Sequence, residues 1–134
     1  MGLPERRAIA AYQKDVFPRW QQKFNDFLGY NLDIQVDWPT LGADGQASHF
    51  EKGFDAIYFE PLMEALKEIA IDDMGKEALK EGFHVYAISG VEPEDRRFYK
   101  FENKRLSYGM TFCNIENYVH ERKQRIVNMF EEKL

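Results

Sequence analysis

Three histidines and several aspartates are the residues of this chain that could carry proton-transfer or metal chemistry. Five of them fall on a predicted strand, the loop after it and a later strand: Asp33, Asp37, Asp44, His49 and His84. Carboxylates and imidazoles that meet in a cleft can transfer protons or bind a divalent ion. We therefore treat these five residues as a candidate ligand-binding site between the polar face of strand 31–38 and loop 39–48.

The spacing of these residues matches no metal or catalytic motif. The chain has no His-x-x-x-His pair, no glycine-rich phosphate loop and no Gly-x-Ser-x-Gly turn. Its one cysteine, Cys113, excludes a cysteine-rich zinc site, and no histidine can be placed beside it as a base. We expect an inert Cys113, no catalytic residue, no metal and no cofactor. A composite metal site is the less favoured alternative, built from Asp33, Asp37, His49 and His84.

A basic cluster between residues 96 and 105 is the clearest binding signal. Its candidate contact residues are Arg96, Arg97, Tyr99, Lys100 and Arg105. Alternating basic and aromatic side chains can hold phosphates and stack on bases, or they can meet another anion or a protein partner. The pI near 5.2 argues against nucleic acid, which needs a net cationic footprint. The same charges could instead keep an exposed strand edge from aggregating.

The net charge of −5 is divided unevenly along the chain. Residues 1–95 carry 9 Lys and Arg against 18 Asp and Glu, a net charge of −9, whereas residues 96–134 carry 9 against 5, a net charge of +4. Such asymmetry is typical of an anion-binding or self-association surface, and it also fits a solvated hairpin and helix. Arg122, Lys123 and Arg125 would extend the basic surface only if they face the hairpin.

Length and composition predict one globular domain. The chain has 134 residues, of which 44% are hydrophobic and 31% charged, and its 11 Phe, 7 Tyr and 2 Trp indicate a dense core. An aromatic-lined pocket or interface is the alternative. A single cysteine fits a reducing compartment, no apolar stretch is long enough for a membrane span, and no signal peptide is visible. We expect a cytoplasmic protein without membrane contact.

Apolar periodicity switches between helix and strand spacing along the chain. The expected elements are a helix over 4–28, a strand over 31–38, helices over 50–69 and 72–82, strands over 83–89, 96–102 and 106–112, and a helix from about Asn114. Pro18 should kink the first helix or break it in two, and Pro61 should kink the next or start a new one. A short strand at 56–59 is the alternative there. Asn103 and Lys104 are expected to form a tight hairpin turn.

These elements predict an α+β fold with one domain over 1–134. We expect an about four-stranded, mainly antiparallel sheet with helices packed on one face, in the order α-β-α-α-β-β-β-α. The strand faces expected to meet under the helices are Leu32, Ile34, Val36 and Trp38 with Leu106, Tyr108, Met110 and Phe112.

Missing motifs, abundant aromatics and the divided charge together favour a non-catalytic protein-binding or interaction module. Such a module would take a protein partner or associate with itself. The alternative is a small-ligand-binding protein or small enzyme that uses the candidate site beside loop 39–48. A nucleic-acid accessory is a third hypothesis, and its binding would depend on Arg97 and Lys100.

Overall fold

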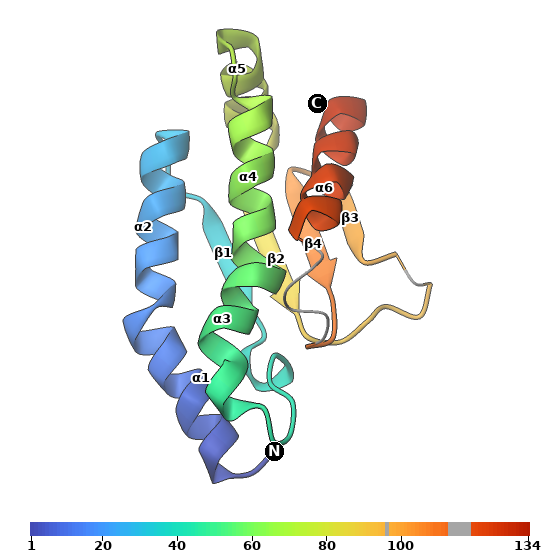
Figure 1. Ribbon diagram of the computed structural model, residues 1–134. Coiled ribbons are helices and arrows are strands. Elements are labelled where there is room, and N and C mark those ends of the chain that lie inside the picture. The colour runs from blue at the N-terminus through green and yellow to red at the C-terminus, as the bar shows by residue number, and fades with distance from the viewer. Residues whose placement is uncertain (96, 113–118) are drawn as a thin grey trace.

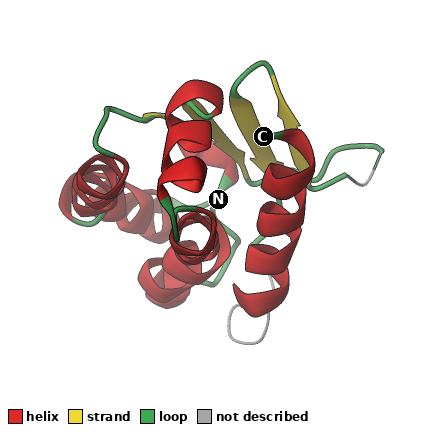
Figure 2. Cartoon of the chain, turned by 90° about the horizontal axis from the view of Figure 1, so that it is seen from above, coloured by secondary structure: helices red, strands yellow, loops and turns green. Residues whose placement is uncertain are grey.

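The protein is a two-layer α+β domain in which the helices lie on one side of a four-stranded sheet (Figures 1 and 2). The computed structural model describes residues 1–95, 97–112 and 119–134. The predicted fold class and the helical layer on one face are confirmed.

The first predicted helix is two helices. Helix α1 (Leu3–Asp15) and helix α2 (Phe17–Leu28) are separated at Val16, and Pro18 lies in the first turn of α2. Proline fits there because its missing N–H needs no helical partner. The buried residues of this pair include Ile9, Tyr12 and Phe24. Phe27, which the helical spacing places in the same stripe, is 40% exposed instead.

The segment after strand β1 (Asp33–Val36) is packed against α1. It contains two short 3-10 turns, η1 (Trp38–Thr40) and η2 (Ala47–His49). The Gly45 N–H donates to Glu5 Oε1 at 2.9 Å, and the amino terminus lies 3.6 Å from an Asp44 carboxylate oxygen. A Cβ on Gly42 would lie 2.9 Å from the Phe50 ring, so glycine permits this close approach.

The helical region around Pro61 stays helical throughout, so the alternative strand at 56–59 is wrong. Helix α3 (Phe50–Phe54) continues through one π-helical turn, η3 (Asp55–Phe59), into α4 (Glu60–Ile69). Pro61 lies in the first turn of α4, and the wider π turn before it accommodates the residue without ending the helix. In η3, Asp55 Oδ1 accepts hydrogen bonds from the Tyr12 hydroxyl at 2.7 Å and from Trp20 Nε1 at 2.8 Å.

The second half of the chain supplies three strands and two helices. They are α5 (Asp73–Gly82), β2 (Val85–Ser89), β3 (Tyr99–Glu102), β4 (Arg105–Gly109) and α6 (Val119–Lys133). Asp72 caps α5 by accepting from the Gly75 N–H at 2.8 Å. The Asn103–Lys104 turn has the expected positive φ angles, 52° and 63°. The expectations for Cys113 and for a helix start at Asn114 fall outside the described residues.

The sheet is mixed and mostly parallel, so the prediction of a mainly antiparallel sheet is wrong. The strand order is β1-β2-β4-β3, with β1–β2 and β2–β4 parallel and only β3–β4 antiparallel. The helices between β1 and β2 form a crossover that returns the chain in the same direction. Strand β3 lies at the sheet edge, and β4 inserts between β2 and β3.

The helix-facing side of the sheet forms the core, and its other side is uncovered. On the inner face, Tyr86, Leu106 and Tyr108 are buried, whereas the outward residues Asp33 and Arg105 are exposed. Aromatic rings dominate the packing, which confirms the expected dense aromatic core. The contacts that join the sheet to α6 are Phe83–Phe130 and Phe101–Phe130, each with ring centroids 5.1 Å apart.

Removing the Asp55 carboxylate should destabilise the fold. We expect Asp55→Ala to lower the free energy of unfolding by about 2–4 kcal/mol, because Tyr12 and Trp20 both lose a charged acceptor. Urea denaturation followed by tryptophan fluorescence measures this loss. Asp15→Ala, at an exposed aspartate of α1, is the matched control and should change the stability by less than about 0.5 kcal/mol. Equal effects of the two substitutions would contradict this role of Asp55.

Acid should weaken the contact between α1 and the loop after β1. The Gly45 N–H holds the pKa of Glu5 below its ordinary value of 4.5. A carboxyl whose pKa is lower in the folded than in the unfolded state stabilises the fold at pH values above the unfolded-state pKa. This stabilisation is lost as the pH falls through the folded-state pKa. The stability advantage of wild type over Glu5→Gln should therefore be largest at neutral pH and shrink below pH 4.5. Urea titrations across this range measure it, and a pH-independent difference would refute the assignment.

Candidate functional site

The five residues of the predicted polar site are not brought together. Asp33 and His84 are neighbours at the start of β1 and β2, where the Asp33 N–H donates to the His84 carbonyl oxygen at 3.0 Å. The His84 ring stacks on Tyr30 at 5.4 Å between ring centroids, and its Nε2 lies 2.6 Å from the Lys80 carbonyl oxygen. Asp37 lies at the opposite end of β1, about 13 Å further along the strand direction.

The remaining two residues of that site belong to the loop packed on α1. Asp44 and His49 are both exposed, and Asp44 faces the amino terminus. Within the described ranges, no group of three or more His, Cys, Asp or Glu residues could hold a metal ion. The arrangement therefore gives no cleft in which these carboxylates and imidazoles could act on one ligand.

The basic hairpin places its residues on different sides of the sheet. Arg97 and Lys100 are exposed, and Arg105 points from β4 to the uncovered outer face. Tyr99 is only 7% exposed, and its ring stacks on Tyr108 with centroids 4.1 Å apart. Burial raises the pKa of the Tyr99 phenol well above 10, so the ring is a neutral packing group. Arg96 lies outside the described residues.

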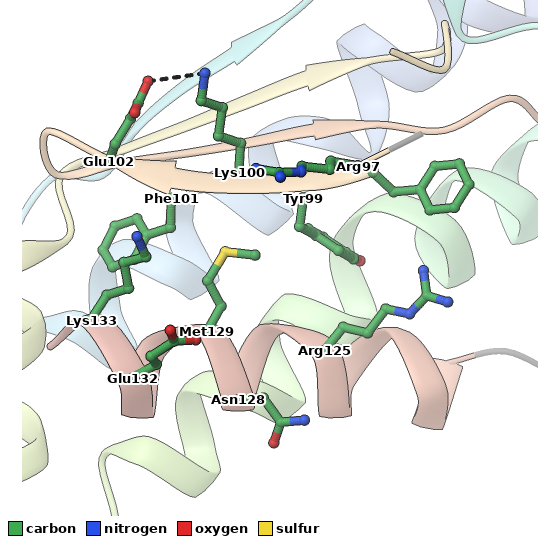
Figure 3. Close-up of a pocket in the computed structure, with 11 residues that line it drawn as sticks. Arg97, Tyr99, Lys100, Phe101, Glu102, Arg125, Asn128, Met129, Glu132 and Lys133 are labelled. Carbon is green, nitrogen blue, oxygen red and sulfur yellow. Dashed lines mark ion pairs between the residues drawn. The ribbon is translucent and has the colours of Figure 1, made fainter. Parts of the chain in front are cut away.

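A groove of about 640 Å³ runs between strand β3 and helix α6 (Figure 3). From β3 and the residues just before it come Arg97, Phe98, Tyr99, Lys100, Phe101 and Glu102; from α6 come Arg125, Asn128, Met129, Glu132 and Lys133. Figure 3 shows Tyr99 and Phe101 pointing from the strand toward the helix, whereas Lys100 and Glu102 point away from it. The groove therefore combines a strand edge, an apolar floor and charged rims.

The hairpin register determines which backbone groups face this groove. The Gly109 N–H donates to the Phe98 carbonyl oxygen at 2.9 Å, which makes Phe98 and Gly109 a hydrogen-bonded pair. In an antiparallel ladder, hydrogen-bonded residue pairs alternate with pairs that share no hydrogen bond. The backbone N–H and C=O groups of Lys100 and Glu102 therefore bond to β4. The N–H and C=O groups of Tyr99 and Phe101 consequently point away from β4, toward the open edge of the sheet.

The opposite edge of the sheet is partly closed by α2. The Leu32 N–H donates to Asn25 Oδ1 at 2.9 Å, and Gln21 Nε2 donates to the Leu32 carbonyl oxygen at 2.8 Å. Two side chains thus satisfy the outward backbone groups where the chain enters β1. The β3 edge carries the charges of Lys100 and Glu102 instead, whose side chains form an ion pair at 3.2 Å on the outer face.

The rims of the groove differ in charge along its length. At the end where β3 begins, the Arg125 guanidinium lies 5.6 Å from the centroid of the Phe98 ring. Arg97 is the residue before Phe98 in the sequence. Met129 reaches from the helix into the middle of the groove (Figure 3). Glu132 and Lys133 lie toward the other end, where acidic and basic groups are mixed.

Three of the eleven residues that line the groove were candidates in the sequence. Arg97, Tyr99 and Lys100 were candidates, and of the helix cations Arg125 faces the hairpin, whereas Arg122 is buried and Lys123 lies 3.3 Å from Glu68. The helix half follows a spacing of three and four residues that marks one helix face: Arg125, Asn128, Met129, Glu132 and Lys133. That signal could have been found, but it does not reveal which strand the face meets.

Two further hollows lie on the uncovered face of the sheet. They measure about 470 and 420 Å³ and are lined largely by small or polar residues of β2 and β4 and by the 90–98 connection. Asp37 and Gln35 line the larger one beside Ser89 and Ser107. These hollows expose side chains, whereas the β3 groove also exposes backbone hydrogen-bonding groups.

Comparison of the chain with protein-family models, curated proteins and solved structures gave no match. In the described part of the chain, no helix combines the length and apolar character needed to cross a membrane.

Hydrogen exchange should show the open edge directly. We expect the amide protons of Tyr99 and Phe101 to exchange with solvent at least about tenfold faster than those of Lys100 and Glu102, because only the latter two bond to β4. Residue-resolved exchange monitored by NMR measures all four rates. Equal protection of the four amides would show that another group covers the edge.

Proposed function

We propose that this chain is a non-catalytic protein-binding module that takes up an extended segment of a partner protein along β3. The observation that supports the proposal most is that the Tyr99 and Phe101 backbone groups point away from β4, at the sheet edge that borders a groove whose other wall is α6. A sheet edge beside a helix suits β-strand addition, in which main-chain hydrogen bonds supply affinity and side-chain pockets supply selectivity.

The size of the edge indicates a reversible interaction. Residues opposite Tyr99 and Phe101 could exchange about four backbone hydrogen bonds, each worth about 1 kcal/mol net. Side chains of the segment that point inward would cover Met129 and the apolar floor. After the cost of ordering the peptide, we expect dissociation constants from about 1 μM to 1 mM.

A role as a small-ligand-binding protein or enzyme has less support. It would use Asp33, Asp37, Asp44, His49 and His84, of which only Asp33 and His84 are neighbours. A surface for nucleic-acid stacking is also less favoured, because the Tyr99 and Phe101 rings are buried against the core. The cytoplasm remains the predicted compartment.

Peptide display on the immobilised protein tests the proposal. Selection from a random peptide library should enrich segments whose binding is weakened at least about tenfold by Met129→Lys, because a lysine there would place a charged ammonium group against the inward apolar side chains of the segment. Met74→Lys is the matched control, since Met74 is 82% exposed on α5. Thermal unfolding of both variants shows that the fold is kept.

Backbone methylation of a selected peptide separates strand addition from simple contact. Methylating the amides one at a time should abolish binding at every second position, because alternate N–H groups of an added strand face β3. Uniform tolerance to methylation, or peptides that bind Met129→Lys as well as wild type, would refute the proposal. Light scattering at the same concentrations should show a monomer; a dimer lost with Met129→Lys would instead make a second copy the occupant of the edge.

A further inference from the structure

We propose that the segment bound along β3 is acidic, with carboxylates directed to the cationic end of the groove. This inference rests on the proposed strand addition and names the chemical class of the ligand. It follows from the charges lining the groove, their partners and the charge of the surrounding chain.

Cations outnumber anions along the groove. Its basic residues are Arg97, Lys100, Arg125 and Lys133, and its acidic residues are Glu102 and Glu132. Lys100 and Glu102 already pair at 3.2 Å, so their charges offset each other on the outer face. The unbalanced positive charge is consequently concentrated at the end that carries Arg97 and Arg125.

The two arginines at this end are available to a ligand. Within the described ranges, neither guanidinium group has a carboxylate within ion-pair distance; Arg125 contacts the face of Phe98, and Arg97 is exposed. Arginine binds carboxylates through two parallel hydrogen bonds, and a guanidinium placed on an aromatic ring keeps donors free for such a pair. A carboxylate of an added strand is the group that this end of the groove fits.

The rest of the molecule would direct an acidic segment to this place. Residues 1–95 carry a net charge of −9, so an acidic peptide is repelled from most of the surface and attracted to the groove. A nucleic acid is also negatively charged and would be attracted to the groove in the same way. It would also need exposed rings for its bases, and Tyr99 and Phe101 are buried.

Strand geometry gives the segment a pattern. Side chains of an added strand alternate, one set pointing with Tyr99 and Phe101 toward α6 and the other pointing with Lys100 to the outer face. The inward set meets Met129, and the outward set meets Lys100 and Arg97, which also lines the outer hollow beside Lys100. The inferred ligand therefore alternates apolar and acidic residues.

Three end-blocked fluorescent peptides test this inference by anisotropy at low salt. They contain three repeats of Val-Glu, Val-Gln or Val-Lys. We expect the Val-Glu peptide to bind at least about tenfold more tightly than Val-Gln, and Val-Lys not to bind. Arg97→Glu should weaken Val-Glu binding about tenfold, because the outward carboxylates meet this side chain. Arg125→Glu reverses the charge across the groove at the same end and should weaken binding about fivefold. Lys104→Glu changes the same charge in the hairpin turn outside the groove, and should have less than about a twofold effect.

Each other outcome has a defined meaning. Equal binding of Val-Glu and Val-Lys, or equal losses from Lys104→Glu and Arg125→Glu, would overturn the acidic ligand while leaving strand addition to the display and methylation results. Binding of no peptide would overturn it likewise. Displacement of Val-Glu by a thymidine oligonucleotide at equal charge concentration would identify a general polyanion surface instead. Thermal unfolding of every variant confirms that the fold is intact.

Discussion

The register of one hairpin determines which side chains are buried in this protein and which backbone groups reach the sheet edge. The Asn103–Lys104 turn joins β3 to β4 with both residues at positive φ, which fixes the pairing of Glu102 with Arg105. A shift of one residue would exchange the inward and outward side chains and the inward and outward backbone groups together. The correct register buries Tyr99 and Phe101 and also turns their backbone groups toward the open edge.

Packing on the inner face of the sheet fixes the position of α6 relative to β3, and the groove lies between them. Phe130 of α6 contacts both Phe83 and Phe101, so the helix is anchored to β3 and to the residues that lead into β2. The buried Tyr58 hydroxyl donates to the Met110 carbonyl oxygen at 2.8 Å, which ties the end of β4 to the π-helical turn. The edge is therefore presented by a rigid core and needs little ordering before a segment adds to it.

Local periodicity was sufficient to predict most elements but not how the strands pair. Alternation in 31–38 and the turn residues Asn103 and Lys104 are local signals. The strand is confirmed over Asp33–Val36, with Trp38 already in a 3-10 turn, and the hairpin turn is confirmed. The parallel pairing of β2 with β4 depends on where the chain goes after β2, and residues 90–95 carry no periodic signal. A mainly antiparallel sheet was expected, whereas the insertion of β4 between β2 and β3 makes β4 parallel to β2.

The candidate site was partly predictable for the same reason. The basic residues of the hairpin stood out by type, but the sequence could not show that Tyr99 faces the core and that Arg125 faces the hairpin. The aspartates and histidines were grouped because they share chemistry, whereas the sheet separates Asp33 from Asp37 by the length of a strand. Placement across elements requires the tertiary structure.

The most direct measurement is the exchange rate of the Tyr99 and Phe101 amide protons with and without a saturating bound segment. If the segment adds to β3 as a strand, both amides should slow by about tenfold or more in the complex, while the Lys100 amide, already bonded to β4, changes much less. Saturated binding that leaves the Tyr99 and Phe101 rates unchanged would place the ligand elsewhere and contradict the account.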